Sequence, residues 1–186
     1  MVFECDGGYC QFTKLATDRE QLQVSLMFKR DELLHDVSNN SWVQSEVSAS
    51  DNVNAKQELK DIVQDGNLDR VLRVLQLAHQ ECIELLYAYT HHTDIVGGEH
   101  LDDAFADPKN YVIDMKVPTT FSRTSLEYLV HLIHEYLVCR VIEDWVSIVM
   151  PDRKVIWAEK IQDIKDKIIS CLSRRSGRIR RSQSPF

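Results

Sequence analysis

The stretch that decides the fold is residues 122–151, "SRTSLEYLVHLIHEYLVCRVIEDWVSIVMP". Apolar residues recur in it at intervals of three and four and a proline ends it, which is typical of one long α-helix. At about 1.5 Å per residue this helix is roughly 40 Å long, and Ser122 or Thr119 begins it. Charged residues and histidines interrupt the stretch too often for a span of about 20 apolar residues. The stretch therefore predicts the central helix of a bundle and no membrane segment.

A second helix is expected directly after Pro151, because proline suits the first turn of a helix. Its apolar residues step by three and four along one side, while lysines and aspartates occupy the other side. Such an amphipathic stripe needs a surface that covers it. We interpret it as part of a partner-binding surface formed by Trp157, Ile161, Ile164 and Ile168.

The chain before the long helix also reads as mainly helical. A broad apolar face predicts a helix over residues 67–89, capped by Asn67. Residues 18–37 are predicted to form one helix and residues 55–64 a short one. The segment between these two helices is predicted to be a polar connection that holds Trp42 as an anchor on the body.

Two segments have β character. "YVIDMKVP" alternates apolar and polar residues and predicts an extended segment or edge strand that ends at Pro118. Two glycines in "VFECDGGYCQF" predict an N-terminal hairpin. The predicted fold is a mainly α bundle with a small β component and extended terminal arms. Its parts are a hairpin or arm at 1–16, a helical body at 17–173 and a basic arm at 174–186.

The C-terminal arm is the electrostatic opposite of the rest of the chain. Residues 174–186 carry five arginines and no acid, whereas the remainder has 17 basic and 29 acidic side chains, a formal charge of −12. Arginine binds phosphate and carboxylate bidentately, so the arm suits nucleic acid or an acidic protein surface. No aromatic residues alternate with the arginines, which disfavours sequence-specific nucleic-acid binding. We expect contact with a neighbouring subunit before DNA, through Arg174, Arg175, Arg178, Arg180, Arg181 and Phe186.

The beginning of the chain and its cysteines suggest a cytosolic protein. No basic region followed by an apolar stretch opens the sequence, so no secretory signal is predicted. Five cysteines at wide spacing, an odd number, favour reduced and mostly packed thiols over a disulfide framework.

The most enzyme-like stretch is "HLIHEYLVCR", in which His131, His134 and Glu135 are potential ligands of a transition metal. The spacing differs from that of zinc proteases, where two histidines four apart flank the glutamate. The other interpretation places the histidines at the edge of a helix contact, with a neutral histidine paired to Glu135 or Tyr136. Glu32 and His35 form half of a di-iron signature whose second half is missing. We therefore predict no cofactor and no catalytic site, and keep the metal site as an alternative.

Several segments resemble a family of uncharacterised proteins from the structural gene clusters of tailed phages and prophages of gut bacteria. They are "FKRDELLHDV", "GNLDRVLRVLQLAHQECIELLYAYT", "YVIDMKVPTTFSRTSLEYLVHLIHEYLVCRVIEDWVSI" and "RIRRSQSPF". A weaker similarity is to helical head-to-tail adaptor proteins, in which an extended segment and a proline precede a long helix with a tyrosine and an arginine. Pro118, Tyr136 and Arg140 stand in those places here.

The resemblance implies a non-enzymatic virion protein that is made in the host bacterial cytoplasm. The expected role is a neck or head-to-tail connector subunit in a homo-oligomeric ring. Its expected partners are portal, tail or other neck proteins, with possible non-specific contact to packaged DNA and no membrane. The alternatives are the metal-binding protein and a nucleic-acid-binding accessory protein that acts through its tail.

Overall fold

The computed structural model describes residues 21–47, 53–90, 107–119 and 121–173. These residues form six α-helices, two 3-10 helices and a two-stranded antiparallel sheet, so the predicted mainly α fold with a small β component is confirmed. The predicted hairpin at 1–16 and the arm at 174–186 lie outside the described residues. In chain order the elements are β1 (Gln21–Lys29), α1 (Arg30–Val47), α2 (Val53–Lys60), η1 (Asp61–Val63), α3 (Asp65–Leu85), α4 (Tyr87–Thr90), β2 (Asn110–Pro118), α5 (Arg123–Val149), η2 (Pro151–Arg153) and α6 (Lys154–Ser173).

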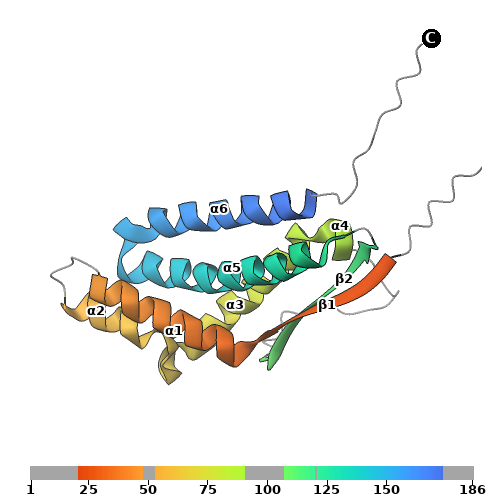
Figure 1. Cartoon of the computed structure of the whole chain (residues 1–186). Helices are drawn as coiled ribbons and strands as arrows, with labels where there is room; N and C mark the ends of the chain where they lie inside the picture. The colour runs from red at the N-terminus through yellow and green to blue at the C-terminus, as the bar shows by residue number, and fades with distance from the viewer. Residues whose placement is uncertain (1–20, 48–52, 91–106, 120, 174–186) are drawn as a thin grey trace, which may run out of the picture.

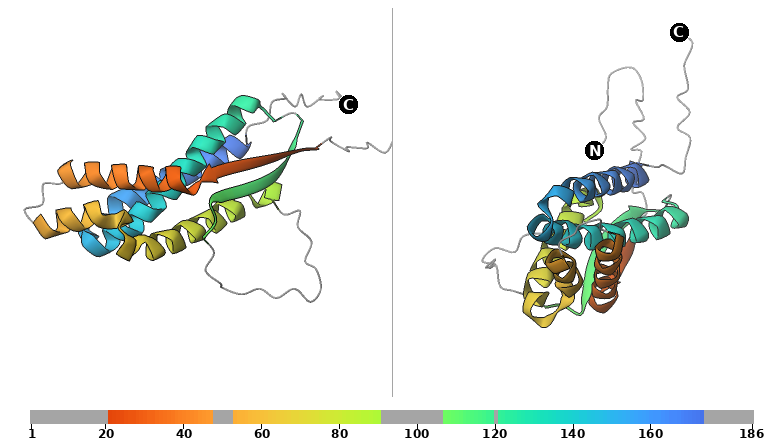
Figure 2. Two further views of the ribbon diagram at one scale, coloured as in Figure 1. Left: turned by 90° about the horizontal axis from the view of Figure 1, so that it is seen from below. Right: turned by 90° about the vertical axis from the view of Figure 1, so that its left-hand side faces the viewer.

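Helix α5 is the centre of the fold, as its sequence predicts. It lies between α6 on one side and the layer of α1, α3 and the sheet on the other (Figures 1 and 2). Its buried residues run from Leu129 to Val146, and Ile133 and Leu137 are among those fully buried. Ser122 precedes the helix and Met150 follows it. Within the described ranges no helix is long and apolar enough to cross a membrane.

Helix α6 folds back along α5, because Pro151 begins a single 3-10 turn that joins the two helices. The predicted helix is confirmed, but the partner-binding role of its stripe is corrected. The four stripe residues are at most 8% exposed and lie in the chain's own core: Trp157, Ile161, Ile164 and Ile168. The surface that covers the stripe is the apolar side of α5, which itself needs burial.

The sheet pairs two strands that are far apart in the sequence. Register places Leu26 opposite Ile113 and Phe28 opposite Tyr111, and all four side chains are buried. Strand β2 confirms the predicted extended segment. Strand β1 occupies the first half of the predicted helix 18–37, so that prediction is wrong. Leu22 and Leu26 are four residues apart, and that spacing fits both the period of a helix and that of a strand. The alternating apolar residues of 21–29 pair with the buried apolar residues of β2.

Helix α1 is longer than expected, since residues 38–47, predicted to be a connection, continue it to Val47. Its buried face is Leu33, Val37, Ser41 and Ser45, each four residues from the next. Because two positions of this face are serines, the face is not continuously apolar in the sequence and its helical period is not apparent. Ser41 donates a hydrogen bond to the carbonyl of Leu59 on α2. Trp42 is 52% exposed, so it is not the predicted anchor.

The middle of the chain agrees with prediction in outline. Helix α2 and the 3-10 helix η1 cover the expected short helix at 55–64, and α3 covers most of 67–89. The cap is different, because α3 begins at Asp65 and Asn67 lies in its first turn. The Asn67 side chain instead donates a hydrogen bond of 2.9 Å to the carbonyl of Asp61 and ties α3 to η1.

Candidate functional site

Two clusters of charged side chains join α5 to its neighbours. The first, which we call the α5 network, consists of Glu81 on α3, Tyr136, Arg140 and Glu143 on α5, and Lys154 on α6. The second, which we call the α1 pocket, is a hollow of about 400 Å³ lined by Asp31, Glu32, His35, Asp36 and His134.

The α5 network is partly buried, with Glu143 as its most buried charged group. Arg140 is its centre: its Nε and one terminal nitrogen each lie 3.4 Å from an oxygen of Glu81, and its other terminal nitrogen binds Glu143. Tyr136 donates its hydroxyl to Glu81 as well. Lys154 Nζ lies 3.5 Å from Glu143, whose side chain is only 8% exposed. The network therefore neutralises its own carboxylates and links three helices.

The pKa directions in the network have a common cause. Burial alone raises the pKa of Glu81, but the hydrogen bonds from Tyr136 and Arg140 outweigh it, so the net shift is downward. Burial, together with the bond to Glu81, raises the pKa of Tyr136 far above its usual range. Both groups thus keep the charge state that the network needs. These shifts favour the ionised carboxylate and the neutral phenol that the hydrogen bond between Glu81 and Tyr136 requires.

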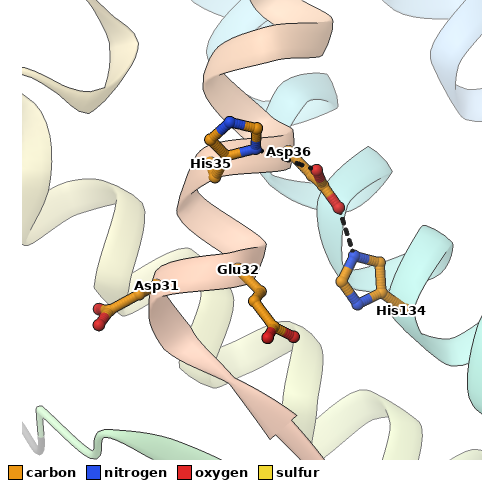
Figure 3. Close-up of a pocket in the computed structure, with 5 residues that line it drawn as sticks. All are labelled: Asp31, Glu32, His35, Asp36 and His134. Carbon is orange, nitrogen blue, oxygen red and sulfur yellow. Dashed lines mark hydrogen bonds and ion pairs between the residues drawn. The ribbon is translucent and has the colours of Figure 1, made fainter.

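The α1 pocket is open, and Asp36 connects its two histidines (Figure 3). Its carboxylate oxygens lie 2.8 Å from His134 Nε2 and 3.4 Å from His35 Nδ1. Asp31 points away from this trio, whereas Glu32 lies on the side of α1 that faces His134 (Figure 3). The Asp31 and Glu32 side chains are 84% and 61% exposed.

Acidic side chains dominate the α1 pocket because α1 begins directly after β1 with two acids in its first turn, where they complement the helix dipole. The hydrogen bond from His134, more than the weaker one from His35, holds the pKa of Asp36 below its usual range. Exposed ion pairs to Lys29 and Arg30 offset part of the negative charge of Glu32 and Asp31. The pocket is therefore suited to an added cationic group that exchanges with water and with these side chains.

The three residues of the alternative metal site do not converge. His131 is exposed, His134 pairs with Asp36 across to α1, and Glu135 accepts a hydrogen bond of 2.6 Å from Lys160. The expected pairing of a histidine with Glu135 or Tyr136 is wrong, because α1 brings Asp36 to His134 first. Across residues 21–47, 53–90, 107–119 and 121–173, no group of three histidine, cysteine or acidic side chains could hold a metal. Glu32 and His35 both line the α1 pocket, but the described acidic and histidine side chains there do not form a group that could hold a metal.

Three cysteines are buried, as the sequence predicts for mostly packed thiols: Cys82, Cys139 and Cys171. Burial raises the pKa of Cys139 to about 12 and that of Cys82 even further. A thiol in that range is protonated at neutral pH and is a poor nucleophile. Cys5 and Cys10 lie outside the described residues.

Sequence reasoning missed the acidic partners in both clusters. Asp36 is 98 residues from His134, and Glu81 is 59 residues from Arg140. Neither acid belongs to a motif, so no local pattern marks it. The five arginines and Phe186 of the predicted arm all lie in residues 174–186, outside the described part of the chain.

Comparison with known proteins gives no assignment. No family model, curated protein sequence or solved structure matches this chain.

Proposed function

We propose that the chain is a non-enzymatic structural protein of a tailed-phage virion, a neck or head-to-tail connector subunit that assembles into a ring. Its basic arm, residues 174–186, binds an acidic surface on the next copy, and portal, tail or other neck proteins are its further partners. The protein is made in the host bacterial cytoplasm and acts in the virion. The sequence resemblance to proteins of tailed-phage structural gene clusters supports this setting.

The observation that carries the proposal is the separation of charge within one chain. Residues 1–173 carry a formal charge of −12 and the arm carries +5. Opposite charges on two parts of the same chain favour head-to-tail contact between copies, since each copy offers both partners. Such a heterologous contact closes into a ring when the rotation between copies allows it.

The α1 pocket is the receptor that we propose for the arm. Its carboxylates at Asp31, Glu32 and Asp36 are at least 44% exposed, and guanidinium groups bind carboxylates in a planar, bidentate geometry. The α5 network supports the same role indirectly, because a body with satisfied buried charges keeps its shape while its surface binds a neighbour.

The first test is direct binding between arm and body. A peptide of residues 174–186, titrated into the full-length protein, is expected to bind more weakly as salt rises. The triple variant Asp31→Asn, Glu32→Gln and Asp36→Asn is expected to weaken binding by about tenfold, an effect of about 1.4 kcal/mol. Asp163→Asn is the control, because Asp163 is an acid on α6 that is 62% exposed, close to the 61% of Glu32, and pairs with Lys167. Equal loss in the control and the triple variant would remove the pocket from the proposal.

The second test is the location of the protein. The wild-type chain is expected in purified phage particles, in a ring visible by electron microscopy. Replacing all five tail arginines by glutamine is expected to prevent incorporation, whereas replacement by lysine retains part of it, since lysine keeps the charge but loses the bidentate geometry. Absence of the wild-type chain from particles would contradict the connector role. Salt-sensitive retention on DNA that is lost without residues 174–186 would instead favour the nucleic-acid-binding alternative.

A further inference from the structure

Among the residues that the structure describes, strand β1 forms an open edge of the two-stranded sheet. Strand β2 lies between β1 and α3 (Figure 2), and within the described residues the main neighbours of β1 are β2 and α1. The other edge of the sheet is partly covered, because a ring nitrogen of His79 on α3 lies 3.1 Å from the carbonyl of Val112. Six of the nine residues of β1 are exposed.

This edge lacks the usual protection against strand pairing. Natural edge strands are blunted by charges, proline or bulges, which keep another strand from adding to them. The sequence of β1, QLQVSLMFK, has no charge before Lys29 and no proline, and its pairing with β2 runs without a bulge over all nine positions. A regular, open edge of this length whose one charge lies at its end is a template for a further strand.

The burial of β1 is also incomplete on the face that points to the core. Across the sheet the residues of β2 on that face are all buried, whereas on β1 burial fades toward the N-terminal end. Leu22 is 53% exposed although its register partner Val117 is 1% exposed. Leu22 is therefore an apolar side chain on the inner face that the described part of the chain leaves half uncovered.

We propose that β1 pairs with β1 of a second copy, antiparallel and centred on Ser25, so that two sheets become one four-stranded sheet. In this register Leu22 lies opposite Phe28 of the partner subunit, and Val24 opposite Leu26 of the partner subunit. The uncovered Leu22 of each copy then extends the apolar layer under the other copy's Phe28, which is 3% exposed in its own chain. One contact therefore pairs the open edge of β1 and also covers the exposed Leu22.

The charges of the strand permit this register. Lys29 is the only charged residue of β1, and antiparallel pairing places it opposite Gln21 of the partner subunit rather than opposite another lysine. The remaining residues on the outer face of β1 are Gln23, Ser25 and Met27, and none of them is charged.

This contact goes beyond the proposed ring. It uses the same patch on both copies and closes at two, so it cannot propagate a ring by itself. It describes the free protein before assembly, in which the pairing hides an edge that would otherwise aggregate. The inference rests on described residues alone and stands whether or not the protein is found in phage particles.

The first experiment places one cysteine on the two-fold axis of the full-length chain, in a Cys5→Ser, Cys10→Ser background that leaves only buried native thiols. Ser25→Cys sets two thiols opposite each other at a Cβ separation of about 5 Å. Mild oxidation or a short bifunctional maleimide is expected to give a covalent dimer. Gln21→Cys is the control, since residue 21 lies about 27 Å from its own counterpart in this pairing, eight residues along the strand. Cross-linking of both variants, or of neither, would overturn the proposed register.

The second experiment changes the face of β1 and follows self-association by sedimentation. Leu22→Glu is expected to weaken the dimer by at least about tenfold, because each copy places a charge against the partner's apolar layer. Met27→Glu is the matched control: Met27 is 59% exposed and lies on the opposite face of the strand, so its dimer is expected to change by less than about twofold.

Two outcomes would overturn the inference. One is a wild-type chain that stays monomeric at about 0.1 mM, which excludes an association of useful strength. If the β1 amides that point away from β2 are then protected from hydrogen exchange in that monomer, the occupant of the edge is the chain's own N-terminal segment. The other is a dimer that persists in Leu22→Glu, which places the interface elsewhere.

Discussion

The α5 network and the α1 pocket both tie α5 to a neighbouring helix through charged side chains, yet they differ in their access to water. Arg140 and Glu143 have side-chain exposures of 28% and 8%, whereas Asp36 in the pocket is 44% exposed. A buried charge without its partner is expensive, while an exposed charge without its partner is hydrated instead. The same chemistry is therefore structural in one cluster and available for binding in the other.

Arg140→Met is expected to have the largest effect on stability of the variants that distinguish the two clusters. It leaves Glu143 buried without its main partner and removes two contacts from Glu81, so we expect a loss of about 3 kcal/mol in the free energy of unfolding, measured with urea. Arg123→Met is the control, because Arg123 is 92% exposed and pairs with the exposed Glu127. We expect that change to cost less than about 0.5 kcal/mol. Equal losses in Arg140→Met and Arg123→Met would mean that burial does not decide how much an ion pair contributes to stability here.

Two buried tyrosines extend the same argument to neutral groups. Tyr136→Phe removes a hydrogen bond to a carboxylate and is expected to cost about 1.5 kcal/mol of stability. The hydroxyl of Tyr111 has no hydrogen-bond partner in the described part of the chain, although the residue is 2% exposed. Tyr111→Phe is therefore expected to leave stability unchanged or to raise it by up to about 1 kcal/mol. Thermal unfolding of the two variants side by side tests the contrast, and a clear loss in Tyr111→Phe would contradict it.

The α5 network and the α1 pocket should contribute differently to the decrease in the free energy of unfolding at acidic pH. The pKa values of Glu81 and Asp36 are lower in the fold than their ordinary values of 4.5 and 3.8, so the unfolded chain binds more protons. Their contribution is thus fully present above those ordinary values and is lost as the pH falls below them. Glu81→Gln is expected to flatten the acid limb of the urea-derived stability curve more than Asp36→Asn does. The reverse order would show that the α1 pocket carries more of the fold than the α5 network.

His134→Gln should have the smallest effect on stability. Its partner Asp36 remains half-exposed and hydrated, so we expect a loss below about 0.5 kcal/mol in urea unfolding. Retained helical circular dichroism would confirm that the fold is unchanged. A loss close to that of Arg140→Met would show that this pair holds α1 on α5 and is not free to serve a ligand.

The elements that the sequence predicted well have a strong local period or a stop signal. Helix α5 has both, and β2 alternates over its whole length. The sequence misled where two periods coincide, as in Leu22 and Leu26, or where small polar residues face the core, as in Ser41 and Ser45 of α1. In those places a contact with another element determines the secondary structure, because β2 pairs with β1 and α2 packs closely on the serines.

The candidate site was only partly predictable for a similar reason. His134 is in a stretch that draws attention by composition, but its partner Asp36 carries no signal of its own. The stripe of α6 was recognised as apolar, yet its periodicity could not say whether the cover came from the same chain or from another.

By itself the sequence determined the helical class, the long helix with its proline stop, and the separation of an acidic body from a basic tail. These features depend on backbone geometry over a few residues or on composition, and neither needs a partner. The tertiary structure alone decided that Arg140 meets Glu81, that His134 meets Asp36, and that β2 is the one strand beside β1 within the described ranges. Such contacts depend on which surfaces pack together, and that is set by the burial of whole elements rather than by any one segment.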